Sequence, residues 1–166
     1  MKITMLYPII ALVMMMLATT GNLMGQDLGF TIKLDKSSYK KGEHIHCTMT
    51  IKNLGKKDVT INNRFLVNRP TGPHEVSLQV VGPDLKEVPF ESKIRASFTS
   101  NKYIVLHPGG TETKTYILTG DFNLFEPGDY SVTAYYENKG NPPGPAPKQP
   151  AWMGTLTSNK LMFKIR

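Results

Sequence analysis

The stretch that decides the fold is residues 45–52, which reads Ile-His-Cys-Thr-Met-Thr-Ile-Lys. Apolar side chains occupy every second position of this stretch, and the residues between them are mostly polar. The same alternation recurs at residues 30–34 and at residues 130–136. A period of two is typical of a strand with one face in a core and the other in water. The sequence therefore predicts an all-β domain.

Short strands and turns account for nearly all of the chain around these three segments. After residue 25, no segment combines helical spacing of apolar residues with capping signals. We expect seven to nine strands arranged as an antiparallel immunoglobulin-like β-sandwich. Strands are expected near residues 30–34, 44–53, 59–61 with a continuation to 67 past a bulge, 76–80, a short return to 90, 103–106, 112–119, 130–137 and 156–165.

One tyrosine marks a more specific feature of this class. Tyr130 follows the turn Glu126-Pro127-Gly128-Asp129 at the start of a late strand. This is the position of the tyrosine corner of immunoglobulin-like sandwiches, where the phenol bonds to the backbone a few residues upstream. This placement supports the broader immunoglobulin-like class.

The first 25 residues differ in composition from the rest of the chain. Lys2 is their only charged residue, residues 5–18 are almost wholly apolar, and residues 19–25 are mainly small and polar. This order is typical of a secretory signal peptide, and 14 apolar residues are few for a bilayer span, which needs about 20. We expect residues 1–25 to be a signal peptide and residues 26–166 to be one domain, exported to the periplasm or the cell exterior. An uncleaved N-terminal anchor is the alternative, and the cleavage site is left open.

The chain has one cysteine, Cys47, so it can form no internal disulfide. By strand parity the Cys47 side chain shares a face with Ile45 and Met49. A free cysteine in this position is expected to be a small buried core residue. A nucleophilic role would need an exposed thiolate and a partner base.

No sequence motif in the chain indicates a catalytic site or a cofactor-binding site. His44 and His46 share a strand face and could both reach one metal ion, but the sequence supplies no further ligands at a suitable spacing. His74-Glu75 lacks the second histidine of a zinc-peptidase motif. We expect no catalytic residues, no cofactor and no metal. The formal net charge is +7, but the basic residues are not interleaved with aromatic residues, as binding of single-stranded nucleic acid requires. No nucleic acid is therefore expected as a partner.

A proline-rich segment is the strongest candidate for a binding surface. Residues 138–150 contain five prolines, so neither a strand nor a helix can persist there. Such a loop is extended at low entropic cost, which favours recognition. The alternative is structural, with the loop covering a sheet edge and Trp152 pinning it. The candidate partner-binding residues are Pro142, Pro143, Pro145, Pro147, Pro150, Trp152 and Tyr135.

Several phrases resemble those of bacterial immunoglobulin-like domains, in the same order. They are Ser-Tyr-Lys-Lys-Gly-Glu at 38–43, Thr-Ile-Lys-Asn-Leu-Gly at 50–55, Val-Val-Gly-Pro-Asp-Leu-Lys-Glu-Val at 80–88, Leu-His-Pro-Gly-Gly at 106–110 and Glu-Pro-Gly-Asp-Tyr-Ser-Val-Thr-Ala at 126–134. The order resembles the intracellular proteinase inhibitor (BsuPI-like) family, and it is similar to the β-domain that precedes the catalytic domain of deuterolysin-type metallopeptidases. The first resemblance implies an inhibitor of serine proteinases, and the second implies a domain attached to a peptidase.

Together these features lead to a functional expectation. The chain is expected to be an exported, non-enzymatic binding or adhesion module that recognises a protein or a glycan. A secreted proteinase inhibitor that acts through an end loop is the alternative. The mature domain is expected to be a monomer, with no membrane span once the leader is removed.

Overall fold

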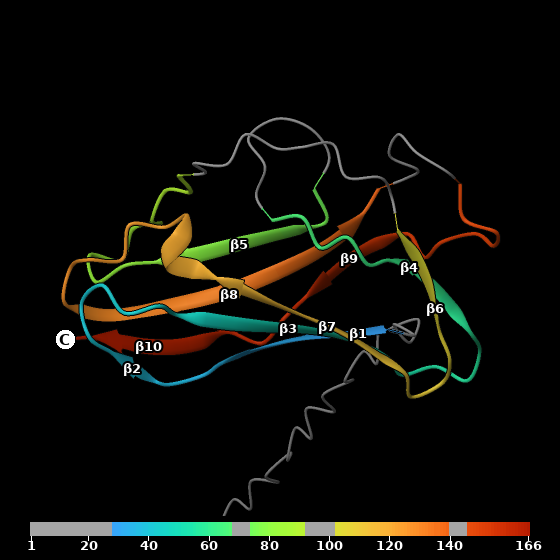
Figure 1. Ribbon diagram of the computed structural model, residues 1–166, viewed down its shortest axis with the longest axis horizontal. Helices are drawn as coiled ribbons and strands as arrows, with labels where there is room; N and C mark the ends of the chain where they lie inside the picture. Colours follow the sequence, from blue (N-terminus) through green and yellow to red (C-terminus); the bar gives the residue numbers. More distant parts are fainter. Residues whose placement is uncertain (1–27, 68–73, 92–101, 140–145) are drawn as a thin grey trace, which may run out of the picture.

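The protein is described by a computed structural model, which covers residues 28–67, 74–91, 102–139 and 146–166 (Figure 1). The expected signal peptide, residues 1–25, lies outside this range. Within the described residues there are ten strands and one short 3₁₀ turn. The elements are β1 (Leu28–Leu34), β2 (Ser38–Tyr39), β3 (His46–Asn53), β4 (Val59–Asn62), β5 (Val76–Val81), β6 (Tyr103–Leu106), β7 (Thr111–Ile117), η1 (Leu118–Gly120), β8 (Gly128–Asn138), β9 (Gly154–Thr157) and β10 (Leu161–Ile165).

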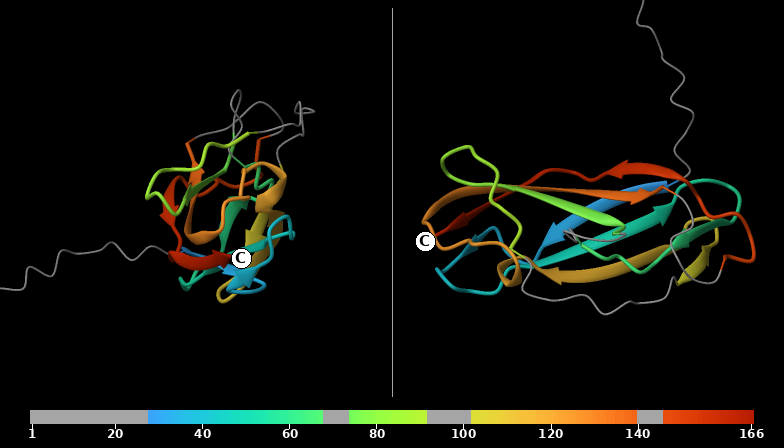
Figure 2. Two further views of the ribbon diagram at one scale, coloured as in Figure 1. Left: turned by 90° about the vertical axis from the view of Figure 1, so that its left-hand side faces the viewer. Right: turned by 90° about the horizontal axis from the view of Figure 1, so that it is seen from above.

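The strands form two main sheets that pack face to face along the long axis of the molecule (Figures 1 and 2). One sheet has the order β1-β3-β7, and the other has the order β2-β10-β8-β5 with β9 also paired to β8. All pairs in these sheets are antiparallel except the short parallel pair of β2 with β10. A third, small sheet of β4 and β6 lies at one end. The predicted all-β sandwich is confirmed.

The alternation in the sequence is the alternation of burial in the structure. On β3, Cys47, Met49 and Ile51 are almost completely buried, and the residues between them reach the surface. On β8, Val132, Ala134 and Tyr136 face the same core from the opposite sheet. Each sheet thus contributes one apolar face, as sheet-on-sheet packing requires.

The expected number of strands, seven to nine, is too low by one. The two-residue strand β2 lies in what the sequence presented as a polar connection. The last expected strand, 156–165, is divided into β9 and β10. The division has a physical cause: the Asn159 side chain accepts a hydrogen bond from the Ile32 amide (2.9 Å) and donates one to the Ile32 carbonyl (3.1 Å). The regular pairing with β8 is therefore interrupted between Thr157 and Leu161, where Ser158 stays bonded to Ala134 while Asn159 binds the free edge of β1.

Three smaller expectations about strand limits are also wrong. Residues 65–67 do not continue β4, because Phe65 adopts a left-handed conformation with φ 53°. The return to residue 90 makes only isolated bridges, Val81 with Glu87 and Phe90 with Phe122. The expected strand 112–119 ends at Ile117, where the chain enters η1.

The tyrosine corner is present. The Tyr130 hydroxyl donates a 2.8 Å hydrogen bond to the Glu126 carbonyl, and its ring stacks on Phe163 with centroids 5.3 Å apart. The turn also requires glycine at position 128 for two reasons. Gly128 has φ 148°, which other residues rarely adopt, and a Cβ there would lie 2.5 Å from the Pro83 ring. The start of β8 is therefore fixed from both sides. Among the described residues, no helix is long and apolar enough to cross a membrane.

We predict that Tyr130→Phe lowers the free energy of unfolding by about 1 kcal/mol, because it removes one hydrogen bond and leaves the Glu126 carbonyl unpaired. Tyr135→Phe is the matched control, since the Tyr135 hydroxyl makes only a long, exposed contact of 3.4 Å to Gln79. Its effect should stay within about 0.5 kcal/mol. Urea unfolding monitored by circular dichroism measures both. Equal effects of the two variants would contradict the role assigned to Tyr130.

The single thiol gives a second prediction. Cys47 is fully buried, and burial raises the pKa of its thiol to about 12. Because the reactive species is the thiolate, the native protein should not react with a disulfide reagent at neutral pH, and one equivalent should react after unfolding in urea. Absorbance of the released thiol chromophore measures both states. Rapid labelling of the native protein would show that β3 opens or that the thiol is accessible.

Candidate functional site

The proline-rich connection joins the end of β8 to the start of β9, at the end of the sandwich that also holds β4 and β6 (Figure 1). Its second half, residues 146–153, is described by the structure. Pro142, Pro143 and Pro145 lie outside the described residues. Of the predicted binding residues, Pro147, Pro150, Trp152 and Tyr135 lie within the described part of the chain.

Trp152 anchors this connection to the sandwich. Its amide donates a 2.8 Å hydrogen bond to the Thr60 carbonyl on β4, and its carbonyl accepts one from the Asn138 side chain at the end of β8. The half-buried indole lies 6.2 Å from the Tyr136 ring, centroid to centroid. Gly154 permits this placement, because a Cβ there would come within 3.0–3.1 Å of the indole. Trp152 therefore fixes the loop to two strands, β4 and β8.

The residues before and after this anchor are presented to solvent. Residues 146–151 and Met153 line an open hollow of about 420 Å³. Pro150 is exposed, Pro147 is half-buried, and Met153 is 54% exposed. The structure therefore brings two of the predicted prolines together with a methionine that the sequence analysis did not select. We call this surface, residues 146–153, the proline strap.

Tyr135 does not belong to the proline strap. Tyr136 faces the core and contacts Trp152, so its neighbour Tyr135 points from the opposite face of β8. It pairs there with Ser77 on β5 and Thr157 on β9. The expectation that Tyr135 and Trp152 contribute to one surface conflicts with this placement, and the cause is the two-residue period of the strand.

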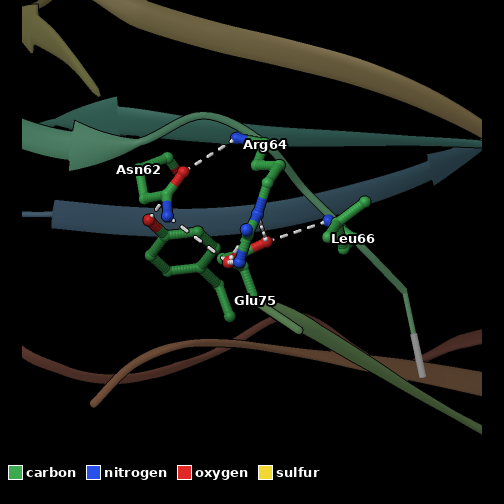
Figure 3. Close-up of polar contacts among 5 residues, drawn as sticks. Asn62, Arg64, Leu66 and Glu75 are labelled. Carbon is green, nitrogen blue, oxygen red and sulfur yellow. Dashed lines mark hydrogen bonds and ion pairs between the residues drawn. The ribbon is translucent and has the colours of Figure 1, made fainter. Parts of the chain in front are cut away.

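A buried ion pair joins Arg64, in the segment after β4, to Glu75, directly before β5 (Figure 3). The Arg64 guanidinium binds the Glu75 carboxylate through Nε, at 3.0 and 3.2 Å from the two oxygens, and also through Nη2. The two side chains are only 6% and 4% exposed. Charges removed from water to this degree need complete pairing.

The remaining lone pairs of Glu75 are also used. Its carboxylate accepts hydrogen bonds from the Leu66 amide at 3.1 Å and the Asn62 side chain at 3.3 Å. The Asn62 side-chain oxygen accepts a bond from the Arg64 amide, so segment 62–66 is folded around the carboxylate (Figure 3). The Asn62 carbonyl in turn accepts the Tyr136 hydroxyl at 2.8 Å. The ion pair therefore fixes an irregular segment to β8, beside the anchor of the proline strap.

No pattern in the sequence predicted this network. Arg64 and Glu75 are 11 residues apart, and no motif or period relates them. The one available signal was a carboxylate, Glu75, directly before a run of strand residues, next to a histidine that matched no metal motif. An ion pair of this kind can be recognised only when the fold has brought the two side chains together.

The histidines selected from the sequence lie on the opposite end of β3 from this network. The rings of His44 and His46 are 6.5 Å apart and nearly perpendicular, and His44 Nδ1 lies 3.4 Å from Thr119 Oγ1. In the part of the chain that the structure describes, no three His, Cys, Asp or Glu side chains are grouped so that they could hold a metal ion.

Comparisons with known proteins give no family assignment. No protein-family model and no curated protein matches the chain. Among solved structures, it is similar to the β-glucosidase EmGH1 of Erythrobacter marinus, with 12% identity and a TM-score of 0.37, and to a β-glucosidase of Listeria innocua crystallised with laminaribiose, with 15% identity and a TM-score of 0.37. The matches cover 84% of this chain and only 15% and 16% of those chains. Likenesses this distant do not bear on what this chain does.

The ion pair generates a stability prediction. Glu75→Gln leaves the buried Arg64 without a countercharge and should cost about 3–5 kcal/mol. The paired replacement Arg64→Met with Glu75→Leu removes both charges and should cost clearly less than the single change, because no buried charge is left. Equilibrium unfolding of the three proteins measures this. A single variant that is as stable as the double variant would contradict the burial of a compensated charge pair.

Proposed function

We propose that this chain is an exported, non-enzymatic binding module that contacts a protein or a glycan through the proline strap. The observation that carries the proposal is the combination found at residues 146–153: Trp152 fixes the backbone, while Pro147, Pro150 and Met153 remain presented to solvent. A surface that is ordered before binding loses less conformational entropy when a partner docks.

The physical setting of the strap supports the proposal. The strap is joined to β4 through the Trp152 amide, and the isolated parallel bridge of Thr60 with Ala151 extends that contact by one residue. Loops held on a rigid scaffold are the usual location of binding residues. Export fits a binding role at the cell exterior or in the periplasm, and it rests on the composition of residues 1–25.

Methionine adds a second argument. The Met153 side chain is unbranched and polarisable, so it adapts to partner surfaces of different shape. Proline supplies an extended, pre-ordered backbone. An exposed methionine beside prolines and Lys148 therefore suits a polypeptide partner, and a glycan would be contacted through the same hollow by the polar backbone and Gln149.

The test uses a displayed random-peptide library and a glycan array, both probed with the purified protein. We predict that ligands selected on the wild type bind at least tenfold more weakly to a variant in which residues 146–150 are replaced by glycine and serine at equal length, and to Met153→Ser. The physical reason is the loss of the ordered apolar contact. Met162→Ser is the matched control, since Met162 is similarly exposed but lies on β10.

The melting temperature separates the two interpretations of the strap. Weaker binding with an unchanged melting temperature supports recognition by the strap. Unchanged binding with a lowered melting temperature or aggregation means that the strap protects a sheet edge, and the proposal is then wrong. A panel of serine and cysteine proteinases is assayed in parallel, and stoichiometric inhibition lost in the strap variant would replace the binding module by the inhibitor.

A further inference from the structure

A leucine at the opposite end of the sandwich has an unusual conformation and an unusual exposure. Leu85 lies at the tip of the turn that follows β5, with φ 62° and 87% of its surface exposed. A left-handed conformation is costly for a leucine, and glycine or asparagine would adopt it with less strain. Because the side chain is also left in water, it contributes almost no burial to the fold. Neither local geometry nor core packing explains a leucine at this position.

The turn that carries Leu85 is rigid. The Leu85 amide donates to the Gly82 carbonyl at 3.0 Å, and the Gly82 amide donates to the Lys86 carbonyl at 2.8 Å. The Asp84 side chain accepts a hydrogen bond from the Lys86 amide at 3.1 Å. At its base, Pro83 packs into the space that Gly128 leaves at the start of β8. The strained tip is thus held in one conformation by the surrounding bonds, as a pre-ordered contact requires.

A second segment, residues 121–126, lies across the hollow from this turn and carries the exposed side chain of Phe125. Phe90 and Phe122 form a β-bridge with ring centroids 5.4 Å apart, and the Glu91 amide donates to the Asp121 carbonyl at 2.7 Å. Between the two segments lies an open hollow of about 580 Å³, lined on one wall by Asp84 and Lys86 and on the other by Asn123 and Glu126. Leu85 adjoins the first wall in sequence, and the half-exposed Phe125 adjoins the second.

The charged side chains that the structure describes around this hollow are mainly negative, although the chain as a whole carries +7. Among the described residues that line it are four carboxylates and one lysine, Lys86, which lies 3.4 Å from the Asp84 carboxylate. The carboxylates are those of Asp84, Glu87, Glu91 and Glu126. A negative rim on a basic protein favours a positively charged partner.

We propose that this hollow, with Leu85 and Phe125 next to its lining residues in sequence, forms a second docking surface for a polypeptide segment in which a large apolar side chain adjoins lysine or arginine. The apolar side chain contacts Leu85 and Phe125, and the basic side chain faces the carboxylates of the hollow. This surface lies at the opposite end of β8 from the proline strap, and it does not depend on the function proposed for the strap.

The probe is an array of synthetic peptides in which leucine, phenylalanine or methionine is placed beside lysine, arginine, glutamate or serine. The purified full chain should bind the peptides with lysine or arginine at least tenfold more tightly than the matched glutamate peptides, and the difference should shrink as salt is raised. Equal binding of basic and acidic peptides, or no binding of either, would overturn the proposal.

Two substitutions separate docking from folding. Leu85→Gly removes the apolar contact and relieves the left-handed strain, so it should weaken peptide binding at least tenfold while the melting temperature stays the same or rises. Leu54→Ser is the control, because Leu54 is also exposed but lies in the turn after β3, and it should leave peptide binding unchanged. Phe125→Ser should weaken binding as Leu85→Gly does. Undiminished binding by Leu85→Gly would overturn the proposal.

Light scattering tests the competing occupant. If the hollow instead accepts a basic region of a second copy, the wild type will form dimers and the Leu85→Gly variant will be monomeric. The basic peptides will then act only as competitors that dissociate the dimer. That result would replace the proposed partner by a copy of this chain. A monomeric wild type that binds the basic peptides supports the proposal as stated.

Discussion

The burial of Tyr136 holds together parts of the molecule that the strand pairings alone would leave separate. The centroid of its ring lies 5.7–6.2 Å from the ring centroids of Phe30 on β1, Phe65 in the irregular segment and Trp152 in the proline-rich connection. A buried phenol must also satisfy its hydroxyl, and here the Asn62 carbonyl accepts that bond. One side chain of β8 thus joins the opposite sheet, the ion-pair segment and the loop anchor.

The chain lacks a disulfide, and polar side chains take the place that a cross-link has in antibody domains. Asn159 satisfies the edge of β1, and Asn53 donates to the carbonyls of Lys57 and Leu106, at 2.8 and 2.7 Å, where β3 ends. Each of these bonds contributes about 1 kcal/mol. Their importance lies in position, since each joins a point where a strand begins or ends to a neighbouring segment, and a free strand edge would otherwise be open to another chain.

The sequence predicted those features that depend on short-range periodicity. Alternation located β3 and β8 and the side of each that faces the core, and a single turn phrase located the tyrosine corner. It could not predict features that depend on contacts between distant segments. The division of the last strand follows from a bond between Asn159 and Ile32, 127 residues apart. The same holds for the candidate site: the prolines were visible as composition, whereas the separation of Tyr135 from Trp152 and the pairing of Arg64 with Glu75 required the fold.

Two residues other than glycine have left-handed backbones among the described residues, and their surroundings are opposite. Phe65 is buried against Tyr136, in the segment that the ion pair fixes. Burying a phenylalanine contributes about 1.5–3 kcal/mol, which offsets the 1–2 kcal/mol that such a backbone costs roughly. Leu85 has the same backbone cost and almost no burial to offset it. At Phe65 the fold therefore offsets the backbone strain by burial. At Leu85 the hydrogen bonds of the turn hold the strained backbone, and they give the leucine side chain itself no structural role.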